Sequence, residues 1–99
     1  MDIKLRQKLI EFNTSRGWGK DHTGANLARA LMIEAAELNR LFQWGDEPID
    51  GDDFENLKDE LADIAIYLEN MTVLYNININ IAVEKKITKN AIKYPENKN

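Results

Sequence analysis

The 99-residue chain contains no cysteine, only two prolines and a single histidine. The lack of cysteine excludes disulfides, thiol nucleophiles and cysteine-based zinc sites. No run approaches the roughly 18 consecutive apolar residues of a membrane-spanning helix. The first six residues alternate charged with apolar side chains, unlike the apolar centre of a secretory signal. We therefore expect a cytoplasmic protein with no membrane partner.

Positive charge is also scarce, since 13 lysines and arginines stand against 17 aspartates and glutamates, which gives a net charge of −4. This balance disfavours a nucleic-acid partner, a helix-turn-helix included, because binding to the phosphate backbone needs clustered positive charge. Residues 85–93 are a basic exception with four lysines. This segment is either a solvated helix face or a surface that faces an anion.

Hydrophobic residues, by contrast, make up 43% of the chain, which is too many for an intrinsically disordered protein. A chain of this length forms one domain, so residues 1–99 are expected to fold together. Chains of this size bury only about 60 to 65% of the surface that they expose when unfolded. The expected core is therefore thin, and association with a second copy would stabilise it.

Apolar residues recur at helical spacing in four segments, separated by short breaks that contain glycine, proline or asparagine. In the first segment Leu5, Leu9 and Phe12 fall on one helical face. The helices are expected at about residues 2–15, 23–43, 52–75 and 78–93. Short connections favour antiparallel neighbours. The sequence therefore predicts an all-α fold, a compact four-helix bundle with a frayed tail at residues 96–99.

Residues 76–81 alternate asparagine with isoleucine, as a strand would. A lone strand has nothing to pair with, so this pattern does not predict a sheet. An asparagine side chain can instead hydrogen-bond the backbone at the start of a helix. We therefore expect a turn in this segment, with Asn78 at the entry to the last helix.

Two acidic pairs interrupt the apolar faces of the two middle helices. At about 100° per residue, Glu34 falls within the arc of leucines on the second helix, and Glu37 lies at the edge of that arc. On the third helix Glu60 falls within the apolar side, and Asp63 lies at its border. The sequence therefore predicts four carboxylates that face inward.

Ionised carboxylates away from water cost several kcal/mol unless they are protonated, paired with a cationic side chain or bound to a metal. Carboxylate oxygens suit a hard cation, Mg²⁺ with Mn²⁺ as a substitute. A carboxylate-bound Mg²⁺ is what phosphoryl and pyrophosphoryl chemistry needs. The alternative is that lysines or arginines of a neighbouring helix neutralise these groups, or that they face solvent.

Other side chains of suitable chemistry lie on the flanking segments. On the last helix Asn90 falls within the apolar stripe, and Lys86 and Lys93 flank the stripe. An amide and two cations in this arrangement suit a polyphosphate. Alternatively, the lysines simply extend along the edge of the helix. Trp18 and His22 precede the second helix, and Trp44 follows it. These rings could stack on a flat base. Alternatively, the tryptophans cover the ends of a bundle and His22 is a capping or surface residue.

The acidic pairs form two motifs, Glu34-Ala35-Ala36-Glu37 and Glu60-Leu61-Ala62-Asp63. Their order matches the signature of the MazG-type nucleoside triphosphate pyrophosphohydrolases, which is Glu-x-x-Glu, a variable spacer, then Glu-x-x-Asp. The surrounding blocks also agree with that family, at residues 18–27, 37–44, 57–67 and 86–95. Nearly the whole chain resembles this family, in particular its small single-domain members and the dCTP pyrophosphatases.

The resemblance implies an all-α fold that assembles as a dimer or tetramer, and Mg²⁺-dependent hydrolysis of a nucleoside triphosphate to the monophosphate and pyrophosphate. It also implies a role in clearing the nucleotide pool, with dCTP as the favoured substrate.

By this analogy the metal is bound by Glu34, Glu37, Glu60 and Asp63. One of these carboxylates would also orient or deprotonate the attacking water. The phosphates would contact, in the same or a neighbouring subunit, Lys86, Asn90, Lys93 and Tyr94. The base and sugar pocket would be formed by Trp18, His22, Trp44 and Tyr67.

Two positions depart from the family's pattern. Arg40 stands where relatives often carry a third acidic residue, but it lies on the polar face of its helix and should matter little. Asn78 stands where many relatives have aspartate, which puts in doubt a charge-dependent role there. Two other functions stay open, a non-catalytic helical interaction module and an all-α dUTPase-like hydrolase.

Overall fold

The computed structural model describes residues 1–47 and 52–97 of the chain. Within these ranges the chain is helical, and no strand is formed, so the all-α prediction is confirmed. The elements in order are α1 (Ile3–Ser15), the short 3₁₀ helix η1 (Trp18–Asp21), α2 (Gly24–Arg40), α3 (Asp52–Leu74) and α4 (Ile79–Lys93). The break at Pro48 and the last two residues of the expected tail lie outside the described residues.

Side-chain caps fix where three of the helices begin. The Asp2 carboxylate accepts from the Leu5 backbone N–H at 2.9 Å, and the Thr23 hydroxyl oxygen accepts from that of Asn26 at 3.1 Å. The Asn78 side chain accepts from the backbone N–H of Ile81 at 3.2 Å. Each cap satisfies an amide that the first helical turn leaves unpaired. The predicted turn with Asn78 at the helix entry is therefore confirmed, and this role needs no negative charge.

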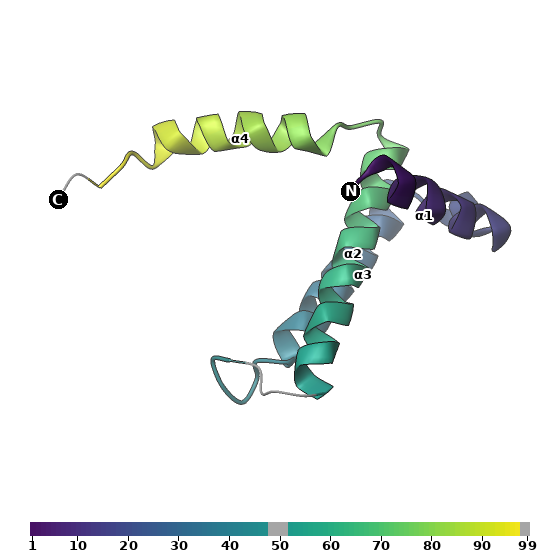
Figure 1. Ribbon diagram of the computed structural model, residues 1–99, viewed down its shortest axis with the longest axis horizontal. Helices are drawn as coiled ribbons and strands as arrows, with labels where there is room; N and C mark the ends of the chain where they lie inside the picture. Colours follow the sequence, from purple (N-terminus) through teal and green to yellow (C-terminus); the bar gives the residue numbers. More distant parts are fainter. Residues whose placement is uncertain (48–51, 98–99) are drawn as a thin grey trace.

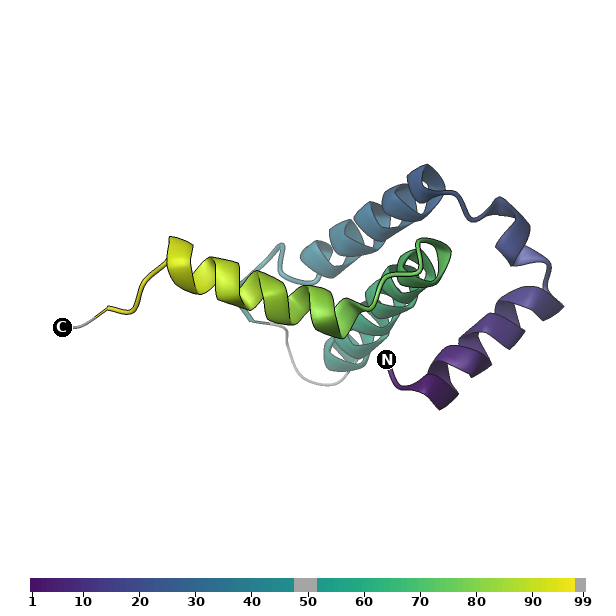
Figure 2. The same ribbon diagram turned by 90° about the horizontal axis from the view of Figure 1, so that it is seen from above.

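Helices α2 and α3 lie side by side and antiparallel, and they form the centre of the molecule (Figures 1 and 2). Gly24 at the start of α2 faces Tyr75 just after the end of α3, and a Cβ at this glycine would overlap the tyrosine hydroxyl. Helix α1 folds back through η1 onto the C-terminal part of α3, which it contacts through Arg6 and Asn13. This arrangement leaves a space between α1, η1 and the central pair.

Helix α4 departs from the expected compact packing. It projects away from the other helices after the turn at residues 75–78 (Figure 1). The radius of gyration is 16.7 Å, whereas a compact chain of this length has about 13 Å. Among the described residues Leu27 is the one buried apolar side chain, while Ile81, Val83 and Ile87 of α4 are exposed. The core within one chain is thin, as expected, because the apolar stripe of α4 has no neighbour there.

No helix in the described ranges is both long enough and apolar enough to cross a membrane.

Candidate functional site

Three of the four predicted inward carboxylates meet between the two central helices. Glu34 comes from α2, and Glu60 and Asp63 come from successive turns of α3. One oxygen from each carboxylate lies within 4.8 Å of the other two, and all three side chains are half-buried. We call Glu34, Glu60 and Asp63 the carboxylate cluster. It forms because positions i and i+3 of a helix share a face, so both acids of α3 point at α2.

Crowding of the carboxyl groups raises the pKa of two members of the cluster. The pKa of Glu60 is raised from 4.5 to about 7, first by a side-chain hydrogen bond with Glu34, then by desolvation, then by the charges of Glu34, Asp63 and Glu37. The pKa of Asp63 is also raised, mainly by desolvation and then by the charges of Glu34 and Asp59. Both shifts favour the protonated form, as expected where carboxyl groups crowd together without a cation between them.

The cluster's chemistry fits a hard divalent cation. Its donors are all carboxylate oxygens, and Glu60 Oε2 is buried without a hydrogen-bond partner. Among the described residues the ion pairs are Arg6–Glu69, Arg40–Glu37 and Lys58–Glu55, none of which involves the cluster. Within the part of the chain that the structure describes, no basic side chain therefore neutralises the cluster. A divalent cation would offset the charge of the three carboxylates and give Glu60 Oε2 a partner.

Glu37, the fourth predicted carboxylate, lies at the rim of the cluster. Its side chain is 45% exposed, and Arg40 Nη1 lies 3.8 Å from its Oε1. It is close enough for its charge to contribute to the raised pKa of Glu60. Arg40, expected to matter little, therefore contacts one of the predicted metal ligands.

A largely apolar cleft of about 970 Å³ adjoins the cluster, and Asp63 lines both. Three of the residues predicted to hold a base, Trp18, His22 and Tyr67, also line it. Trp18 is fixed there by an edge-to-face contact with Phe12, with ring centroids 5.3 Å apart. Because flat apolar walls and aromatic rings favour stacking, this cleft suits a nucleobase.

The structure does not bring the other predicted substrate residues to this cleft within one chain. Trp44 follows α2 at the end remote from Trp18 and is 91% exposed. The predicted phosphate contacts lie on or just after α4, which runs away from α2 and α3 (Figure 1); they are Lys86, Asn90, Lys93 and Tyr94. Their distance follows from the direction of α4, which helical periodicity does not specify.

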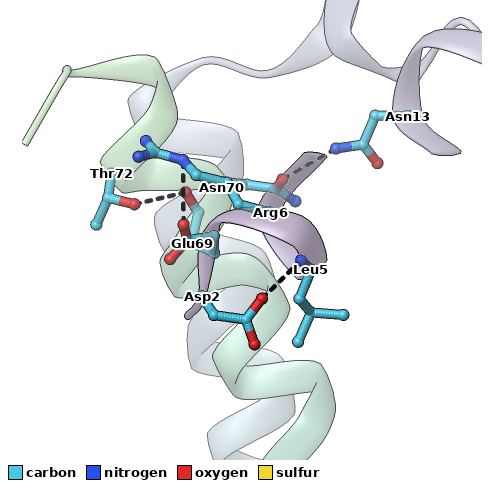
Figure 3. Close-up of polar contacts among 7 residues, drawn as sticks. All are labelled: Asp2, Leu5, Arg6, Asn13, Glu69, Asn70 and Thr72. Carbon is cyan, nitrogen blue, oxygen red and sulfur yellow. Dashed lines mark hydrogen bonds and ion pairs between the residues drawn. The ribbon is translucent and has the colours of Figure 1, made fainter. Parts of the chain in front are cut away.

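Sequence reasoning missed two asparagines that also line the cleft. Asn13 of α1 and Asn70 of α3 are buried, and the side-chain amide of Asn13 donates to Asn70 Oδ1 at 3.0 Å (Figure 3). A signal for them exists, because each lies four residues after an apolar residue of its helix, Leu9 and Ile66 respectively. An amide on the apolar face of each of two helices indicates a buried polar contact.

The raised pKa of Glu60 predicts how stability depends on pH in the absence of divalent cations. Between pH 4.5 and 7 the folded chain binds more protons than the unfolded chain, so the free energy of unfolding falls as the pH rises. Asp63 contributes in the same direction. Urea unfolding in EDTA across this pH range should show the fall in the free energy of unfolding. The Glu60→Gln variant should show a smaller dependence on pH. A matched change on the exposed face of α3, Glu55→Gln, should leave it intact; a flat wild-type profile would show that the carboxyl groups do not interact.

The fold and the cluster define an all-α protein in which two antiparallel helices present converging carboxylates beside an apolar cleft. No family model matches the chain. The chain is 32% identical over 97 residues to dCTP pyrophosphatase 1 from human and from rat, and 33% identical to that from cattle. These matches cover 92% of the chain, which spans 57% of the length of these relatives.

A solved structure is similar over nearly its full length. It is a pyrophosphatase from Archaeoglobus fulgidus, with 39% sequence identity and a TM-score of 0.81 over 94% of this chain and 91% of that one. The similarity extends to fold and sequence together, and it agrees with the acidic motifs. The chain belongs to the MazG-like pyrophosphohydrolase family.

Proposed function

We propose that this chain is a diphosphate-releasing hydrolase that converts a nucleoside triphosphate, dCTP foremost, to the monophosphate and pyrophosphate with Mg²⁺ as cofactor and Mn²⁺ as a substitute. The observation that carries the proposal is the carboxylate cluster, which lacks a cationic partner among the described residues and adjoins a cleft of a size and lining that suit a base. Its relatives among the pyrophosphatases support it. The role that follows is removal of nucleotides from the cytoplasmic pool.

In this proposal the carboxylate cluster binds the cation and Glu37 acts as the general base. Glu34, Glu60 and Asp63 would hold the cation, which offsets phosphate charge and orients a water molecule. Release of pyrophosphate requires water to attack the α-phosphorus, while the bridging oxygen leaves with the pyrophosphate. A carboxylate must take the proton of that water, and Glu37, which is 45% exposed at the rim of the cluster, would take this role. Trp18, His22 and Tyr67 would hold the base and sugar.

A second copy of the chain completes the site in this proposal. Helix α4 projects from its own chain with exposed apolar residues, among them Ile81 and Ile87, which association would bury. The same helix carries Lys86 and Lys93, which suit a phosphate held at an acidic cluster. We therefore place the phosphate contacts of α4, and Trp44, at the site of a neighbouring subunit in a dimer or tetramer.

Metal binding has a thermodynamic consequence that does not depend on catalysis. Mg²⁺ at about 100 times its dissociation constant should stabilise the chain by about 2.7 kcal/mol, which corresponds to a rise in Tm of about 10 °C or more. Asp63→Asn should lose this rise, and Glu55→Gln on the exposed face of α3, where Glu55 pairs with Lys58, should keep it. Differential scanning fluorimetry with Mg²⁺ and Mn²⁺ tests this; an equal rise in both variants would place the cation elsewhere.

The proposal is tested by pyrophosphate release from a panel of nucleoside triphosphates, with and without EDTA. We expect release from dCTP that EDTA abolishes. A non-catalytic interaction module would release none and would show no coupled binding of Mg²⁺ and a non-hydrolysable triphosphate in calorimetry. A dUTPase-like relative would instead favour dUTP over dCTP.

A further inference from the structure

The buried asparagine pair lies in the wall of the cleft, where most of the lining is apolar. Asn13 and Asn70 are 9% and 6% exposed, and they join α1 to α3 through one hydrogen bond (Figure 3). A buried amide is costly unless its polar atoms are satisfied, so two bonded amides in an otherwise apolar cleft wall need an explanation beyond filling space.

Each amide has a second polar atom that the pair does not use. In residues 1–47 and 52–97 neither Asn13 Oδ1 nor Asn70 Nδ2 makes a hydrogen bond. Neither atom is fully buried, however, because Glu60 Oε2 is the one fully buried side-chain oxygen or nitrogen without a partner in these ranges. These two amide atoms are therefore accessible to solvent or to a ligand. Asn26, a third asparagine of the cleft, differs because its amide donates to the Asp21 carbonyl.

The pair always offers one donor and one acceptor. If both amides turn over together, the bond between them is kept with its direction reversed, and again one N–H and one oxygen are left. That is the complement of one edge of a pyrimidine. Cytosine presents a donor on its exocyclic nitrogen beside the acceptor N3, and uracil presents the reverse.

The pair also lies at a suitable distance from the carboxylate cluster. Asn70 follows Asp63 by seven residues, which is two helical turns and about 10.5 Å along α3. Both residues line the cleft, and Tyr67 lies between them on the same helix. A nucleotide with its phosphates at the cluster would therefore extend its base past the aromatic rings toward the amide pair.

We propose that Asn13 and Asn70 together recognise the edge of a pyrimidine base, one amide bonding the exocyclic group at position 4 and the other bonding N3. This rests on the proposed function for the presence of a nucleotide in the cleft. The pair distinguishes a base that carries a polar group at position 4 from one that does not. Its orientation is reversible, so it admits both cytosine and uracil.

The test is the affinity of the full chain, with Mg²⁺ present, for two deoxynucleoside monophosphates measured by calorimetry. The first is dCMP, and the second carries 2-pyrimidinone, which lacks the exocyclic group at position 4. The wild type should bind dCMP about tenfold more tightly, the effect of one lost hydrogen bond. The double variant Asn13→Leu/Asn70→Leu should bind both equally, and it leaves no single amide unpaired in the interior.

A matched control is Thr72→Val. Thr72 is also buried on α3, but its hydroxyl donates to the Glu69 carbonyl at 2.8 Å and does not line the cleft. This variant should keep the tenfold preference. Equal affinities in the wild type, or a preference that survives in the double variant, would mean that the asparagine pair only ties α1 to α3, and would overturn the proposal.

Two further readouts separate this proposal from folding defects and from the proposed function. In ¹⁵N-labelled wild type, dCMP should shift the side-chain amide signals of Asn13 or Asn70, and the 2-pyrimidinone nucleotide should not. Equal responses to the two nucleotides would overturn the proposal without the use of any variant.

The second readout is the binding of the monophosphate itself, which does not require hydrolysis. A chain that releases no pyrophosphate yet prefers dCMP through this pair would refute the hydrolase and support the base recognition.

Discussion

Replacing Glu60 with glutamine should lower kcat for pyrophosphate release by about 100-fold or more, because mutations outside the ligand shell of metal sites already cost 10- to 100-fold. Glu60 is the centre of the carboxylate cluster, with the raised pKa and the buried unpartnered oxygen. Glutamine keeps the shape of the side chain and removes its negative charge. The variant should therefore fold at least as stably without metal as the wild type.

The control for this prediction lies on the same helix. Glu55 pairs with Lys58 on the exposed face of α3, with an N–O distance of 2.8 Å and both side chains more than half exposed. Glu55→Gln should leave kcat and stability nearly unchanged, since an exposed ion pair contributes little. Full activity of Glu60→Gln in steady-state kinetics would remove the cluster from the mechanism.

Removing both lysines that flank the apolar stripe of α4 should have an effect of similar size. Each charge-assisted hydrogen bond to a phosphate contributes about 1.5 to 3 kcal/mol, so Lys86→Ala/Lys93→Ala should lower kcat/KM by about 100-fold or more. In one chain these residues lie on a helix that projects away from α2 and α3. The loss should therefore arise at the site of the neighbouring subunit. The control on this helix is Lys85→Ala, which lies beside Lys86 but outside the predicted phosphate contacts.

Complementation shows whether α4 acts across the subunit boundary. Mixed oligomers of the Glu60→Gln chain and the double-lysine variant, isolated through two different tags, should recover about half of wild-type activity in a dimer, since one of two sites is intact. If α4 served its own chain, both sites would be defective and activity would stay at the level of the single variants. Failure to isolate any mixed oligomer would contradict the proposed assembly.

The carboxylate cluster could be predicted because helical periodicity is local. The three cluster acids share faces with leucines of their own helices, and nothing beyond the period of the helix is needed to point them inward. Glu37 shows the limit of this reasoning. Its angle on α2 is close to that of Glu34, yet its exposure and its contact with Arg40 depend on how far α2 overlaps α3.

Longer-range features could not be predicted from the sequence, for a different reason. The direction of α4 is set by a short turn in which Asn76 adopts a left-handed backbone conformation with φ of 53°, and apolar spacing contains no information about that angle. The Asn13–Asn70 contact joins residues 57 positions apart. It depends on how α1 folds back through η1 onto α3, so only the pattern of an amide on an apolar face was visible in advance.

The central claim is that Glu34, Glu60 and Asp63 bind one divalent cation together. The most direct measurement is the anomalous difference map of a crystal grown with Mn²⁺, with data collected at the manganese edge. We expect a peak within about 2.0 to 2.3 Å of an oxygen from each of the three carboxylates. A map without a peak there, or with a lysine or arginine of a neighbouring subunit filling the space between the carboxylates, would contradict the account.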